Sequence, residues 1–132
     1  MDAVVKHLPE LLAALFLAIL FIQSGLDKVF DWKGNIEWLT GHFAKTPLAK
    51  MVPVMLATIT VMELLTGVLA AVGVVYFLAA GSTVVIFYAG VVGALAILAL
   101  FFGQRVAKDY PGAAVLVPYF ILALITIYLT KP

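Results

Sequence analysis

Long apolar runs separated by short polar connectors dominate the chain. Apolar residues fill most of positions 8–30, 53–77, 82–103 and 113–130. Each run is long enough to cross a bilayer as a helix, because a hydrocarbon core of about 30 Å requires about 20 residues. The pattern therefore predicts an all-α fold, a single bundle of four transmembrane helices with both termini on one side of the membrane.

The second and third helices are separated only by a weak turn signal. Glu63 is the one charged residue between positions 51 and 102, and a single helix of that length would measure about 78 Å. The chain must therefore turn back, and Gly81 is the best place because glycine closes helices in the left-handed conformation. A turn near Gly73 is the alternative. Pro118 lies inside the fourth run and should bend that helix.

The connector at positions 31–52 mixes charges with large apolar side chains. A possible cap, Asn35, is followed by apolar residues at helical spacing, and indole side chains favour the headgroup level of a bilayer. We therefore expect a short interfacial helix between the first and second membrane helices. The residues behind this prediction are Trp32, Ile36, Trp38, Leu39 and Phe43.

Composition identifies a membrane protein and excludes several classes of partner and cofactor. Of 132 residues, 65% are hydrophobic and 11% are charged, against about 25% charged in soluble domains. The net charge of +1 gives no basic face for nucleic acid, so the expected partners are the lipid bilayer, other membrane subunits or a second copy. Cysteine is absent, which excludes disulfides and iron–sulfur ligation by this chain.

The basic residues predict an orientation. The connectors at 28–50 and 103–112 carry most of the Lys and Arg residues, whereas the terminal side has Lys6 and Lys131. Cytoplasmic loops are enriched in these residues. We therefore expect a multi-pass protein of the cell inner membrane with cytoplasmic connectors. The first apolar run is expected to remain as a helix rather than to be removed as a signal peptide.

Glu63 is the clearest anomaly in the apolar runs. It follows Pro53 by ten residues, which places it about 15 Å into the membrane by helix rise. A carboxylate there costs at least about 2.5 kcal/mol and must be neutral, paired or near water. One interpretation is a protonated Glu63 that is bonded to a hydroxyl or carbonyl and locks the bundle.

The other interpretation is a polar pocket at the connector end of the first three helices. The third helix runs parallel to the first, so charged residues that end both helices emerge at the same level. Such a pocket could hold a quinone head group, another small ligand or a relayed proton. The residues assigned to this cluster are Gln23, Asp27, Lys28, Glu63, Gln104, Arg105 and Asp109.

Other chemistries fail on spacing. His7 and His42 are predicted on opposite sides of the membrane, so they cannot hold a haem between them, and neither is expected to have a special role. The sequence contains no metalloprotease motif and no phosphate-binding glycine loop. We expect no metal site and no covalently bound cofactor, with a quinone as the one candidate ligand.

Three segments resemble the DoxX family of small four-helix bacterial membrane proteins. They are "SGLDKVF" at the end of the first helix, "MELLTGVL" in the second and "GQRVAKDYPGAA" after the third. By this resemblance, Lys28, Glu63 and Arg105 correspond to the charged residues of the family pattern. The family is named for its similarity to the membrane subunit of an archaeal thiosulfate:quinone oxidoreductase, and other members are linked to redox or oxidative-stress assemblies.

Three functions are consistent with this pattern. The first is a membrane subunit of a quinone-linked redox or respiratory complex, with the polar pocket near the quinone. The second is a non-catalytic accessory or scaffold protein whose charges only lock the bundle. The third is a small lipid or solute carrier, because inward-facing charges also mark transport paths. Whether the chain is itself an enzyme stays open.

Overall fold

The computed structural model describes residues 2–132, and this part of the chain is built from helices. Four helices are long and apolar enough to cross a membrane, which confirms the predicted bundle: α2 (Leu8–Phe30), α4 (Val52–Ala80), α5 (Val84–Val106) and α6 (Tyr110–Thr130). The shorter elements are α1 (Asp2–Lys6), α3 (Trp32–His42) and the 3-10 turn η1 (Ala49–Met51). Helix α3 is the short helix expected between the first two spans.

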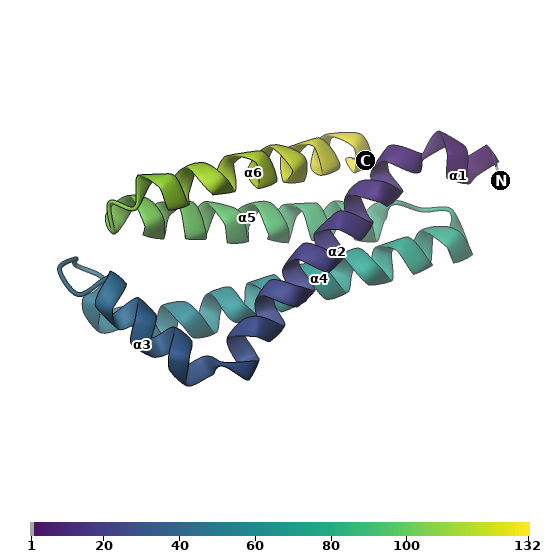
Figure 1. Ribbon diagram of the computed structural model, residues 1–132. Helices are drawn as coiled ribbons and strands as arrows, with labels where there is room; N and C mark the ends of the chain where they lie inside the picture. Colours follow the sequence, from purple (N-terminus) through teal and green to yellow (C-terminus); the bar gives the residue numbers. More distant parts are fainter. Residues whose placement is uncertain (1) are drawn as a thin grey trace.

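The long helices form one bundle whose two ends differ in character (Figure 1). Helices α4, α5 and α6 run side by side with alternating direction, and α2 crosses α4 obliquely and packs mainly against it. Both termini and the α4–α5 turn lie at one end, whereas α3 and the α5–α6 connector lie at the other. We call the second the connector end.

Small residues allow α2 and α4 to approach closely where they cross. A Cβ atom added to Gly67 would lie 2.5 Å from Ile22 Cγ1 and 2.8 Å from the Ile22 backbone nitrogen. No side chain fits at that distance, so glycine sets the spacing of the two helices. Next to this crossing, Leu17 and Phe21 of α2 are buried with Ile97 of α5. The crossing therefore fixes how the end of α2 lies over the middle of α4.

The turn between α4 and α5 lies where the sequence predicts it. Gly81 adopts φ of 73° and closes α4 through a backbone bond from its amide to the Phe77 carbonyl. Helix α4 extends three residues beyond the expected end at position 77, and α5 begins at Val84 rather than at position 82. The Gly81 turn therefore comes directly after a helix that is longer than expected.

Helix α6 begins three residues earlier than the sequence analysis expects. Its first residue is Tyr110, so Pro111 and Gly112 form the first turn instead of a separate loop. Proline is tolerated there because its missing amide needs no partner. Asp109 caps this turn, since its Oδ1 atom accepts a hydrogen bond from the Gly112 amide at 3.0 Å. The helix continues through Pro118 to Thr130.

Candidate functional site

Lys28 and Glu63 form an ion pair between α2 and α4. The Lys28 Nζ atom lies 2.8 Å from Glu63 Oε1, and the two side chains are 19% and 2% exposed. Helix α2 runs antiparallel to α4, so the end of one helix carries Lys28 over the interior of the other. The long lysine side chain then reaches the buried carboxylate. The predicted anomaly at Glu63 is thus compensated by a basic partner, as the cost of an isolated charge requires.

Ser24 completes the surroundings of the Lys28 ammonium. Nζ donates to Ser24 Oγ at 2.8 Å and, more weakly, to the Ser24 carbonyl at 3.3 Å. The pair with Glu63 is close but poorly aligned, so Oε1 of this buried carboxylate accepts no hydrogen bond from residues 2–132. Within the same range no hydroxyl or carbonyl bonds to Glu63, so its partner is Lys28 rather than the neutral group considered above.

Gln23 and Asp27 are not part of this cluster, although the sequence analysis assigned them to it. Both side chains are exposed. One residue along a helix turns the side chain by about 100°, so these positions lie beside the stripe that carries Ser24 and Lys28. Gln23 follows the exposed residue Phe16 by seven positions, so it lies on the same outward face of α2.

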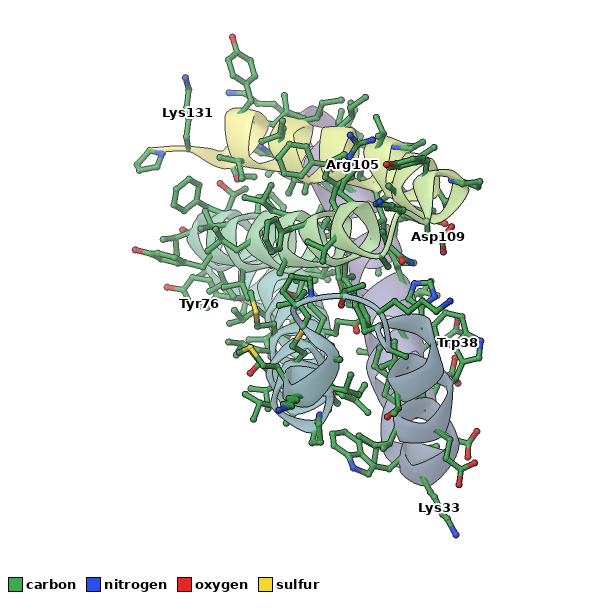
Figure 2. All side chains as sticks on the ribbon, turned by 90° about the vertical axis from the view of Figure 1, so that its left-hand side faces the viewer. Lys33, Trp38, Tyr76, Arg105, Asp109 and Lys131 are labelled. Atoms are coloured by element: carbon green, nitrogen blue, oxygen red, sulfur yellow. The ribbon has the colours of Figure 1, made fainter. Side chains whose placement is uncertain are left out.

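Arg105 is also apart from the buried pair. It is exposed, and its guanidinium lies 4.6 Å from the centre of the Tyr110 ring. Arg105 follows Leu98 by seven residues on an outward stripe of α5, and Leu98 is 52% exposed. The structure therefore does not bring this arginine to the Lys28–Glu63 pair. Figure 2 shows Arg105 near α6, away from Trp38 on α3.

Gln104 and Asp109 meet a residue to which the sequence analysis gave no role. His42 Nε2 lies 2.9 Å from Gln104 Oε1 and 3.8 Å from Asp109 Oδ2. Trp38 stacks on the histidine ring with centroids 4.5 Å apart. These contacts hold α3 against the α5–α6 connector. Only the four-residue spacing of Trp38 and His42 was visible in the sequence, because Gln104 lies 62 positions further along the chain.

A largely apolar cavity of about 570 Å³ lies beneath α3, between the start of α4 and the end of α5. Lys28 and Gln104 contribute polar groups to its wall. Several wall residues are exposed, among them Val54 at 64% and Phe102 at 62%, so the cavity opens at the outer surface of the helix bundle. We call it the α3 cavity. Its other wall residues include Asn35, Trp38, Leu39, Phe43, Met55, Leu56, Ile59 and Ala99.

The α3 cavity has the character of a site for an amphipathic molecule. Small-molecule sites typically measure about 300 to 1,000 Å³ and combine apolar walls with few polar groups that orient the ligand. Among the described residues, no cluster of three or more His, Cys, Asp or Glu side chains could hold a metal ion. The geometry therefore favours binding of an apolar molecule with a polar head.

A protein-family model covers the first three membrane helices in large part, including both members of the buried pair. The DoxX family model matches residues 10–94, which is more than half of the chain. This protein belongs to the DoxX family. The matched range of this DoxX protein contains Lys28 and Glu63, whereas Gln104, Arg105 and Asp109 lie beyond it. Comparison with curated proteins and with solved structures gave no match.

Proposed function

We propose that this DoxX protein is the membrane subunit of a quinone-linked redox complex and that the α3 cavity holds the quinone head group. The observation that carries the proposal is an apolar cavity that opens at the outer surface of the helix bundle, with Lys28 and Gln104 in its wall. A quinone reaches its site from the bilayer, and its ring needs apolar walls with hydrogen-bond donors for the two carbonyl oxygens. The inner membrane, with the connector end in the cytoplasm, is the proposed location.

The Lys28 ammonium is suited to one of these carbonyls. It donates hydrogen bonds to Ser24 Oγ and to the Ser24 carbonyl, and it contacts Glu63 as an ion pair without a hydrogen bond to Oε1. The contact with the Ser24 carbonyl is the longest, at 3.3 Å, so a ligand oxygen can replace it while the other two persist. The ion pair then positions a charged donor at the polar end of the cavity.

Trp38 provides a direct test of quinone binding. The chain has two tryptophans, so Trp32→Phe leaves Trp38, a wall residue of the α3 cavity, as the single indole. A short-chain ubiquinone analogue titrated into this protein in nanodiscs should quench the fluorescence with saturation. Ala99→Phe in the cavity wall should weaken binding at least about tenfold, which corresponds to a loss of about 1.4 kcal/mol.

The control for this titration is Ala79→Phe, the same substitution at an exposed position near the far end of α4. It should bind the quinone like the parent. Equal affinity in the Ala99→Phe and Ala79→Phe proteins, or quenching that only follows quinone partition into lipid, would refute the cavity assignment. Gentle extraction should in addition recover larger redox subunits, and their absence would contradict the role as a subunit.

The accessory function is a second candidate because one observation favours it. Lys28 already has partners within the protein, Ser24 through hydrogen bonds and Glu63 through its charge, which is also what a purely structural lock between α2 and α4 requires. The double variant Lys28→Met/Glu63→Leu separates the two functions, since it removes both charges together. Normal quinone reduction by the complex that contains this variant would favour the accessory function, and loss with intact assembly would favour the quinone site.

A further inference from the structure

A second cavity of about 600 Å³ lies at the connector end between two loops. One wall runs from the end of α3 into the loop that follows it, at positions 41, 42 and 44–47, and the other runs from the end of α5 into the α5–α6 connector, at positions 106–108. Lys45 and Lys108 approach it from opposite walls, and His42 and Thr46 add polar groups. We call it the lysine cavity.

The two lysines of this cavity have no acidic partner within the described part of the chain. No carboxylate oxygen of residues 2–132 lies within 4.0 Å of Lys45 or Lys108. The nearest acidic group in the connector is Asp109, and it is already engaged by the Gly112 amide and by His42. The lysine cavity thus holds two positive charges with which no carboxylate of residues 2–132 forms an ion pair.

Two lysines without an acidic partner among residues 2–132 would attract an anion, and the position of the lysine cavity indicates which kind. It lies at the end of the membrane helices, beside Trp38, whose indole is a typical headgroup-level side chain. Lysine is a common phosphate ligand as a mobile point charge. We propose that the lysine cavity binds a phosphate group, with Lys45 and Lys108 as its charged ligands and Thr46 as a hydroxyl ligand. The phosphate would come from an anionic lipid headgroup or from a free phosphate ion.

Occupation of this cavity would also affect the wall of the α3 cavity. His42 lines the lysine cavity and contacts Gln104, which lines the α3 cavity. A phosphate that joins the two loops would hold α3 against α5 at this contact. The binding proposal itself does not depend on the quinone function.

The test uses the full chain in neutral detergent micelles, with the midpoint of thermal unfolding followed against added ligand. The three probes are phosphatidylglycerol, phosphatidylcholine and inorganic phosphate. Binding to the folded state raises the midpoint with ligand concentration and so gives an apparent affinity. The test variant is Lys45→Gln/Lys108→Gln, and the control is Lys33→Gln/Lys131→Gln. Figure 2 shows Lys33 extending away from the other helices and Lys131 at a separate site.

We expect stabilisation by phosphatidylglycerol that exceeds that by phosphatidylcholine and weakens as salt is raised. The test variant should bind roughly 30-fold more weakly, because each lysine near an anionic surface contributes about 1 kcal/mol to binding and the variant lacks two of them. Each single variant should lose about fivefold, which keeps the test informative if the double variant folds poorly. A response to phosphatidylglycerol alone assigns a lipid headgroup, and a response to inorganic phosphate assigns the free ion.

Three results would overturn the proposal. They are no stabilisation of the wild-type protein by either anion, wild-type affinity in the Lys45→Gln/Lys108→Gln variant, and an equal loss in the Lys33→Gln/Lys131→Gln control. The last two would mean that general attraction to a basic protein surface, rather than this cavity, determines binding.

Discussion

Removal of the Lys28 charge should destabilise the protein more than any other single change at the connector end. The substitution Lys28→Met keeps most of the unbranched side chain and deletes the ammonium. Glu63, with a side chain that is 2% exposed, would then lack its counter-charge in the middle of the bundle. The variant therefore isolates the cost of a buried carboxylate without a basic partner.

The magnitude follows from the geometry of the pair. At the observed 2.8 Å, two unit charges attract by about 6 kcal/mol for an effective dielectric constant of about 20. Desolvation of both groups offsets much of this attraction, and breaking a buried pair by removing one partner costs about 3 to 5 kcal/mol. Because Lys28 keeps 19% of its side chain exposed, we expect the lower value, about 3 kcal/mol.

The double variant Lys28→Met/Glu63→Leu should recover most of this loss. Replacement of both partners of a buried pair by apolar residues is often neutral or stabilising. The free energy of unfolding is measured for the parent, both single variants and the double variant by titration with a denaturing detergent in mixed micelles. The resulting cycle gives the coupling energy between the two positions.

Two outcomes would refute this reasoning. A loss below about 1 kcal/mol in Lys28→Met would mean that the pair behaves like an exposed salt bridge. Additive losses in the double variant would mean that the two side chains act independently, and that the 2.8 Å contact does not contribute to stability.

Further predictions concern the helix crossing and the α6 cap. Gly67→Ala should destabilise the protein by about 1 to 3 kcal/mol through overpacking against Ile22, whereas Gly41→Ala, where a Cβ meets nothing within 4 Å, should be neutral in the same unfolding titration. Asp109→Ala should lose about 1 kcal/mol because the Gly112 amide loses its cap; Asp109→Asn should retain most of the stability, and equal losses would exclude capping as the cause.

The sequence predicted the bundle because membrane helices are determined by local composition. Runs of apolar residues gave the four spans, and Gly81 gave the turn between α4 and α5. Helix ends were predicted less well where the same residue types occur both in loops and in the first turn of helices. Pro111 and Gly112 resemble a loop signal, but in the first turn of α6 they are compatible with a helix that Asp109 caps.

The candidate site was predicted only in part. The depth of a residue in the membrane is easier to predict from the sequence than the direction in which its side chain points. The sequence placed Lys28 and Glu63 in one polar cluster at the connector end, and the structure brings these two side chains together. The direction in which each side chain points follows from helical spacing: Gln104 lies seven residues after buried Ile97, whereas Arg105 lies seven residues after exposed Leu98. In the first helix, Gln23 and Asp27 likewise point outward and are exposed.

The contacts of His42 could not be predicted in this way, because they depend on how α3 folds back over the bundle. Periodicity within each helix does not determine the distance between a connector residue and Gln104. The structure brings these residues together and thereby forms a wall between two cavities of different character. His42→Phe with Gln104→Leu would keep an apolar wall and remove the polar contact.

A buried ion pair adds little net stability to a helix bundle, because the cost of removing both charges from water offsets much of their attraction. The small net gain suggests a function other than stability for the pair. An apolar replacement at both positions would hold α2 on α4 about as well, and the close crossing at Gly67 already fixes the spacing of these helices. Stability therefore does not explain why a charged donor lies in the wall of an apolar cavity. The proposed recognition of a polar head group would explain it, because a charged donor makes a stronger hydrogen bond to a carbonyl oxygen than a neutral donor, and low polarity strengthens that bond further. If the apolar double variant assembles normally but no longer binds quinone, this explanation is supported over the structural lock.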